Sequence, residues 1–208
     1  MVPPKIKIFE IKDVVAFALV DYISELSANS IACHGSFSVA LPSVVPLDSS
    51  DYNFKLAYDE FLSKEGLSLE EKTEEYEQLL KHLVANKTLR ISPISGFAKF
   101  DLMLIGMGPE GHVGSMFCWL FQRFEKQKWV PYLTDSPKPP PQRITFTFPL
   151  INSSYEVAMV VTRGDAADAG KVALGKHAND GYPLPVQKIS HEGTLTSFLD
   201  KEDTLELS

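Results

Sequence analysis

The sequence predicts an α/β fold in which helices cover a mostly parallel β-sheet. Segments with strand-like and helix-like spacing of apolar residues alternate along the 208-residue chain, which is the pattern of layered α/β proteins. The apolar run FDLMLI at 100–105 is typical of a strand buried on both faces. No internal repeat or linker-like stretch divides the sequence, so we expect one domain over residues 1–208.

The elements of the first half follow from apolar periodicity and from helix-end signals. The alternation of polar and apolar residues over Lys5–Phe9 predicts a strand. A helix beginning at Asp13 is predicted by apolar residues at helical spacing, and Gly35 predicts its end. These apolar residues are Val15, Leu19, Tyr22 and Leu26. A second strand is predicted at Phe37–Leu41 and a second helix at Asp51–Ser63.

A third helix is predicted from Ser68, because Glu71 stands three residues later, at the spacing of a capping box. Its apolar stripe consists of Leu69, Tyr76, Leu80 and Leu83. Glutamates crowd its early turns, which indicates a solvated helix face or, alternatively, a partner-binding surface. Further strands are predicted at Ile144–Phe148 and Val157–Val161, followed by a helix at about Asp165–Lys176.

Composition limits the classes of function. Hydrophobic residues make up 44% and charged residues 23% of the chain, as in soluble globular proteins. The formal net charge of −7 argues against nucleic-acid binding, which needs a basic face. The apolar runs fall short of the ~18 residues of a membrane helix, and the N-terminus lacks a leader pattern. With two cysteines, these features predict a cytoplasmic protein without a membrane or nucleic-acid partner.

A glycine-rich turn follows the predicted strand at 100–105 and precedes a predicted helix. Gly106, Gly108 and Gly111 stand in this turn, where glycines let backbone N–H groups approach an anion. The spacing also matches a dinucleotide-binding loop, but Pro109 interrupts it and the acidic residue that would bind a ribose is missing. The turn therefore favours an anion site over a dinucleotide site.

His112 comes one residue after the last glycine, at the carboxyl end of a central strand, where α/β proteins place their ligands. A histidine there is a candidate for proton transfer near neutral pH, although an isolated histidine is more often structural. Glu110 is either a residue that orients the ring or a simple loop carboxylate. The other histidines are predicted to lie at the surface; they are His34, His82, His177 and His191.

A second candidate segment is Asp135–Thr147, DSPKPPPQRITFT. Its prolines predict a rigid loop that presents Lys138 and Arg143 at little entropic cost. Arginine binds phosphate or carboxylate with two parallel hydrogen bonds, so the loop is a candidate anion-binding element. The alternative is a rigid surface loop whose basic residues pair with ordinary acids.

Together the two segments resemble the 6-phosphogluconolactonase family, within the wider group that includes glucosamine-6-phosphate isomerases. Residues 104–117, LIGMGPEGHVGSMF, are similar to the family's LLGMGPDGHxASLFP, and Asp135–Thr147 matches its DSPKPPPERITxT apart from Gln142. Asp51–Lys64 and Phe148–Ser153 are also similar to family segments. The resemblance implies a three-layer α/β fold of the glucosamine-6-phosphate isomerase/6-phosphogluconolactonase type.

The resemblance also implies a reaction and a set of residues. The reaction is hydrolysis of a small phosphorylated sugar lactone, 6-phospho-D-glucono-1,5-lactone, to 6-phosphogluconate in the oxidative pentose phosphate pathway, without a metal or organic cofactor. His112 matches the family's general base, and Glu110 beside it is the second residue expected to be catalytic. The residues expected to hold the anionic substrate are Gly106, Gly108, Gly111, Lys138, Arg143 and Arg163.

The chain departs from the family pattern in its first half. Residues 42–45, PSVV, stand where the family has a glycine-rich phosphate loop. Asp51 follows Leu41 within ten residues, so a helix, a strand and an Asp-Glu-Arg motif are absent. A later family lysine aligns with Ala166. The departures predict a fold that lacks one strand–helix segment, weaker substrate binding, and a monomer or weak homo-oligomer. The alternative function is a catalytically impaired or inactive member that acts as a binding or structural module.

Overall fold

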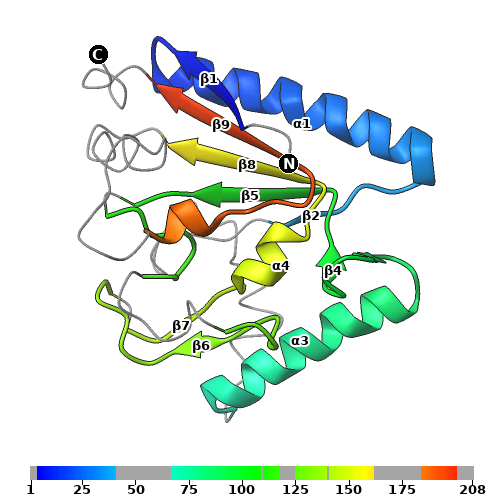
Figure 1. The fold of residues 1–208 in the computed structure, drawn as a ribbon, viewed down its shortest axis with the longest axis vertical. Coiled ribbons are helices and arrows are strands. Elements are labelled where there is room, and N and C mark those ends of the chain that lie inside the picture. Colours follow the sequence, from blue (N-terminus) through cyan, green and yellow to red (C-terminus); the bar gives the residue numbers. More distant parts are fainter. Residues whose placement is uncertain are drawn as a thin grey trace.

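The computed structural model describes residues 4–40, 67–108, 110–117, 125–139, 141–161 and 184–200. Within them, five parallel strands form one sheet in the order β1-β9-β8-β5-β2 (Figure 1). The strands are β1 (Lys5–Phe9), β2 (Val39–Ala40), β5 (Leu102–Gly106), β8 (Glu156–Val161) and β9 (Thr194–Asp200). The predicted α/β fold with a mostly parallel sheet is confirmed. The predicted helices at 51–63 and 165–176 lie outside the described residues.

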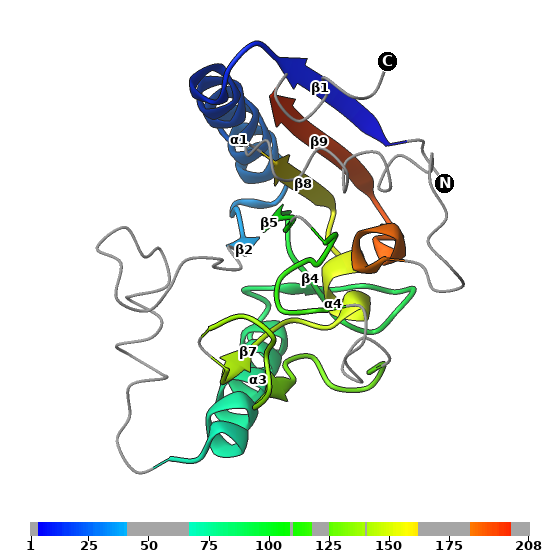
Figure 2. The ribbon, with the colours of Figure 1, turned by 90° about the vertical axis from the view of Figure 1, so that its left-hand side faces the viewer.

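Helices lie on both faces of the sheet (Figure 2). Alternate residues of each strand point to opposite faces, and β5 shows this directly. Leu102 and Leu104 pack toward α1 (Lys12–His34), whereas Met103 and Ile105 join the larger core on the other face. That core includes residues of α3 (Leu69–Ala85) and α4 (Phe148–Asn152). The sheet is therefore the middle of three layers.

The long helix α1 begins and ends close to the predicted positions. Gly35 takes a left-handed φ of 81°, and its N–H donates to the carbonyl of Ile31, which ends the helix. The predicted stripe packs against Phe198 and Ala158 of the sheet; it consists of Val15, Leu19, Tyr22 and Leu26. The outer side is also apolar, with Phe17 74% exposed. By length and composition α1 could cross a membrane, so the predicted absence of a membrane partner stays a prediction.

The helix α3 carries the predicted capping box. Ser68 accepts a hydrogen bond from the backbone N–H of Glu71, and the Glu71 side chain accepts one from the Ser68 N–H. Its predicted residues Tyr76, Leu80 and Leu83 face the core.

Two antiparallel strand pairs lie near α3. They are β3 (Arg90–Ile91) with β4 (Ala98–Lys99), and β6 (Tyr132–Leu133) with β7 (Arg143–Ile144).

One predicted strand is wrong, and one strand of the five-stranded sheet was not predicted, nor were the two-residue strands β3, β4 and β6. The strand expected at 144–148 is divided, because β7 ends at Ile144 and α4 begins at Phe148. Pro149 fits the first turn of a helix and would remove a hydrogen bond from a strand. The unpredicted strand of the five-stranded sheet is β9, which lies between β1 and β8 and follows the short 3-10 helix η4 (Pro185–Lys188). The helix expected after the glycine turn does not begin by Phe117, and residues 118–124 lie outside the described part of the chain.

Candidate active site

The glycine turn leaves β5 at its carboxyl end and folds back on itself. The N–H of Gly108 donates to the carbonyl of His112 at 3.0 Å, and the N–H of Gly111 donates to the carbonyl of Gly108 at 2.8 Å. Gly111 has a φ of 74°, in the left-handed region that glycine adopts readily. Both N–H groups therefore have hydrogen-bond partners within the turn. The His112 ring lies directly over the backbone of Gly108.

The absence of a side chain at Gly108 makes room for that ring. A Cβ atom built on Gly108 would lie 1.9 Å from Cε1 and 2.2 Å from Nδ1 of His112. Both distances are far below van der Waals contact. A Cβ on Gly111 would lie 2.7 Å from Cδ1 of Leu184, just before η4. Gly108 and Gly111 thus have a structural role, since they let His112 and Leu184 pack against the turn.

His112 is held in a buried position with only 3% of its surface exposed. Its ring stacks on Phe117, with the ring centroids 4.5 Å apart. Nδ1 lies 3.3 Å from Oε2 of Glu110, although the two atoms are not aligned as a hydrogen bond. A buried polar nitrogen without a hydrogen bond is costly, so this nitrogen is a feature that packing alone does not explain.

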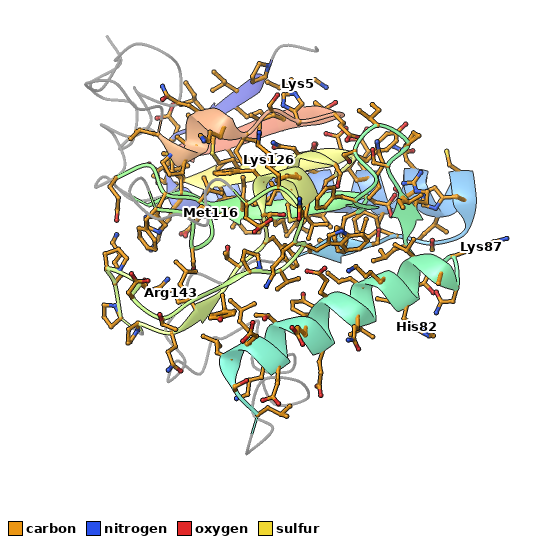
Figure 3. All side chains as sticks on the ribbon, turned by 60° about the horizontal axis from the view of Figure 1, so that its bottom comes forward. Lys5, His82, Lys87, Met116, Lys126 and Arg143 are labelled. Carbon is orange, nitrogen blue, oxygen red and sulfur yellow. The ribbon has the colours of Figure 1, made fainter. Side chains whose placement is uncertain are left out.

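The proline-rich loop meets the glycine turn at Glu110. Lys138 Nζ donates to Oε2 of Glu110 at 2.9 Å, the same oxygen that faces His112. Arg143 Nη2 donates to the carbonyls of Lys138 and Pro139 at 3.0 and 2.8 Å, and its guanidinium lies 5.9 Å from the Phe117 ring centroid. Figure 3 shows Arg143 at the opposite end of the view from Lys87.

The two segments singled out in the sequence therefore form one cluster. The structure brings together four of the predicted residues, namely Glu110, His112, Lys138 and Arg143. Arg163 lies outside the described residues. Phe117 belongs to the cluster but was not predicted, because an apolar residue after a strand and turn is indistinguishable from core in the sequence.

Burial of the ring favours the neutral form of His112. Burial lowers the pKa of His112 below its ordinary value of 6.5; the Glu110 carboxylate acts in the opposite direction, and the cations of Lys138 and Arg143 lower the pKa again. Burial is the largest single influence and acts to raise the pKa of the Glu110 carboxyl, but the hydrogen bond from Lys138, a backbone hydrogen bond and the charges of His112 and Lys138 together outweigh it, and the pKa is lowered. At neutral pH the arrangement is an ionised carboxylate beside a neutral imidazole, which can accept a proton.

Of the other histidines, His34 and His82 are exposed as predicted. The prediction for His191 is wrong, because this residue is 5% exposed in the loop before β9. His177 lies outside the described residues. Within the described part of the chain, His, Cys, Asp and Glu side chains form no group of three that could hold a metal ion.

Comparison with known proteins identifies the family. The family model for glucosamine-6-phosphate isomerases/6-phosphogluconolactonase matches residues 43–197. The chain belongs to this family. A protein of Arabidopsis thaliana named 6-phosphogluconolactonase 3, chloroplastic, is 50% identical over 170 residues, which cover 76% of this chain and 51% of the relative. A protein of Oryza sativa subsp. indica named Probable 6-phosphogluconolactonase 3, chloroplastic, is 40% identical over 239 residues, which cover 93% and 73%.

Solved structures of the family share the fold. The 6-phosphogluconolactonase of Trypanosoma brucei superposes with a TM-score of 0.79 at 20% identity, and the match covers 100% of both chains. A monomeric glucosamine-6-phosphate deaminase superposes with a TM-score of 0.57 at 16% identity. The three-layer fold that the sequence resemblance implied is therefore the fold of this family.

The comparisons also agree with a shortened chain. A family member of Arabidopsis thaliana named Probable 6-phosphogluconolactonase 5 is 35% identical over 256 residues, and the alignment covers 100% of both proteins. This alignment is longer than the 208 residues of the present chain, so the relative has residues without a counterpart here. The predicted position of the gap, between Leu41 and Asp51, lies outside the described residues. Some family relatives are named chloroplastic and others are not, so the cytoplasmic location stays a prediction.

Proposed function

We propose that this protein hydrolyses 6-phospho-D-glucono-1,5-lactone to 6-phosphogluconate, with His112 as the general base. Family membership supports the reaction. The observation that carries the residue assignment is the buried imidazole at the carboxyl end of β5, with the Glu110 carboxylate 3.3 Å from its Nδ1. A carboxylate that faces one ring nitrogen favours the tautomer with the proton on that nitrogen. In His112 this nitrogen is Nδ1, so Nε2 is left to accept a proton in catalysis.

The proposed reaction needs one water and no redox step. Nε2 of His112 takes a proton from the water as its oxygen attacks the lactone carbonyl carbon. The new C–O bond gives a tetrahedral oxyanion, and hydrogen-bond donors or a cation beside the carbonyl stabilise this charge. Collapse of the oxyanion breaks the ring C–O bond, and the ring oxygen leaves as a hydroxyl after it receives the proton from His112. The product is an open-chain acid that ionises in water.

The anionic phosphate of the substrate needs partners of its own. Arg143 lies beside the Phe117 ring in the same cluster as His112, and we assign it to the substrate together with Arg163 and the backbone of Gly106. The internal hydrogen bonds of Gly108 and Gly111 make the turn a support for His112 first. Lys138 already has a carboxylate partner, so we do not assign it to the phosphate.

A second candidate is a member with impaired or absent catalysis that serves as a binding module. The observation that favours it is the longer alignment of relatives described above. The missing residues include, by the sequence resemblance, elements that hold the phosphate. Each charge-assisted contact to the phosphate that is lost weakens the free energy of substrate binding by about 1.5–3 kcal/mol.

The deciding experiment compares purified protein with His112→Ala and with His82→Ala. The lactone is generated fresh by glucose-6-phosphate dehydrogenase, and the spontaneous rate is subtracted. We expect His112→Ala to lose about 10²- to 10⁴-fold in rate, the usual contribution of a general base. His82 is exposed on α3, so its variant should retain full activity. A folded wild-type protein that never exceeds the spontaneous rate would contradict the lactonase and support the binding module.

A further inference from the structure

Lys138 and His112 approach the same carboxylate oxygen. Oε2 of Glu110 accepts a hydrogen bond from Lys138 Nζ at 2.9 Å and lies 3.3 Å from Nδ1 of His112. The Lys138 side chain is 40% exposed and that of Glu110 29%, so neither burial nor crowding forces the pair together. Their contact bridges residues 28 positions apart in sequence and joins the proline loop to the glycine turn.

The backbone around Lys138 is fixed before any substrate binds. Its carbonyl accepts hydrogen bonds from Arg143 Nη2 and from Ser136 Oγ. Ser136 Oγ in turn accepts from the Lys138 N–H at 3.3 Å, and the Ser136 N–H donates to the carbonyl of Pro141 at 3.0 Å. With prolines on both sides, this loop has few conformations to lose. The Lys138 ammonium group therefore contacts Glu110 from a rigid loop.

We propose that Lys138 is a positioning residue, which holds the Glu110 carboxylate ionised and fixed against Nδ1 of His112, and that it does not bind the anionic group of the substrate. A lysine that bound phosphate would have to leave this carboxylate, and the carboxylate would repel the same phosphate. As an ion pair, the two residues instead present little net charge to the substrate. The catalytic part of this inference rests on the proposed lactonase function.

The ion pair also determines how His112 responds to pH. The charged groups that face His112 from the two loops are Glu110, Lys138 and Arg143. Without the Lys138 ammonium, one positive charge that disfavours the protonated ring is lost, and the pKa of His112 rises. A general base must be neutral to accept a proton, so the low-pH decline of the rate moves to higher pH. Removing the Glu110 charge has the opposite effect and lowers the pKa of His112.

The test measures the pKa of His112 directly, by NMR titration of its ring Cε1–H, alongside kcat and KM from pH 5 to 7.5. The His112 signal is the one absent from His112→Ala. We expect Lys138→Met to raise this pKa and to shift the rate profile to higher pH, and Glu110→Gln to lower it. Lys138→Arg, which keeps the charge, should restore the wild-type values. Lys126→Met is the matched control, because Lys126 is exposed.

The outcomes separate the positioning role from substrate binding and from the proposed function. A Lys138→Met protein with a higher KM, the wild-type pKa of His112 and an unchanged profile would overturn the proposal and make Lys138 a substrate ligand. Lys138→Gln is the second variant; a raised pKa there supports an effect of charge, and a wild-type pKa contradicts it. The titration needs no turnover, so a wild-type protein without lactonase activity would refute the proposed function while the NMR result still decided the role of Lys138.

Discussion

The two ends of β5 each carry a carboxylate, a histidine and a cation, yet the two clusters are built differently. At the amino end, Asp101 contacts His34 Nε2 at 3.1 Å and forms an ion pair with Arg90. Its Oδ2 also accepts hydrogen bonds from the N–H and the hydroxyl of Ser38, at 2.8 and 2.6 Å. At the carboxyl end, Glu110 faces a buried His112 whose Nδ1 is not hydrogen-bonded.

The difference lies in which member of each cluster is buried. At the amino end the carboxylate is buried, with 5% of its side chain exposed, and the histidine side chain is 25% exposed. At the carboxyl end the histidine is buried and the carboxylate is 29% exposed. A buried carboxylate with several donors ties elements together. A buried neutral histidine whose Nδ1 faces a carboxylate keeps Nε2 as a proton acceptor. The same residue types thus serve as a scaffold at one end and as a candidate site at the other.

The largest effect on stability should come from Asp101→Ala. It removes the ion pair with Arg90 and the acceptor for both Ser38 donors, which connect β2 to the start of β5. We expect the free energy of unfolding to fall by about 3 kcal/mol, as measured by urea denaturation. Lactonase activity per folded molecule should stay unchanged. Asp21→Ala, at an exposed position of α1, is the control. An equal loss of stability in this variant would show that the Asp101 contacts have no special role in holding the amino end of β5 together.

Gly108→Ala should have the reverse pattern, with a loss of rate and a modest change in stability. The new Cβ would lie 1.9 Å from Cε1 of His112, so the ring must move by an ångström or more. A displacement of that size costs about a hundredfold in rate, measured as kcat/KM. Gly96→Ala is the comparison, because its Cβ would meet open space although its φ is 76°. It should cost about 1–2 kcal/mol of stability and leave the rate intact; a Gly108→Ala enzyme with the wild-type rate would refute His112 as the base.

The smallest effect is expected from His34→Ala. The His34 side chain is partly exposed, and Asp101 keeps Arg90 and both Ser38 donors without it. We expect the free energy of unfolding to change by less than about 1 kcal/mol. Thermal unfolding of the wild-type protein and of His34→Ala measures this difference. A loss as large as that of Asp101→Ala would show that the histidine, and not the serine and arginine contacts, holds the amino-end cluster together.

Local signals made much of the fold predictable from the sequence. The Ser68–Glu71 capping box, the Gly35 helix end and the apolar strand before the glycine turn each depend on neighbouring residues, and all three are confirmed. The strand β9 was missed because Thr196 and Ser197 are buried in it, so its apolar pattern is weak. The strand expected through Phe148 failed because Pro149 starts a helix.

The candidate site was predictable by residue type but not by contact. The sequence marked Glu110, His112, Lys138 and Arg143 as candidates, but it did not indicate that Lys138 contacts Glu110. The ion pair between Lys138 and Glu110 joins two loops, and no local pattern reports such a contact. His191 illustrates the same limit, since whether a histidine in a loop is buried depends on elements that pack over it. The prediction of one domain and the expected absence of a cofactor stay predictions.

The position of β9 has a consequence for how the chain folds during synthesis. Among the described residues, β1 has one neighbouring strand, and Lys5 pairs with Thr196, close to the end of the chain. At a synthesis rate of 5–20 residues per second, the first strand waits about 10 to 40 s for its partner. Throughout that interval the apolar side chains of α1 have no complete sheet to cover. The strand β1 and the helix α1 therefore expose apolar surface during synthesis for longer than segments whose partners follow closely along the chain.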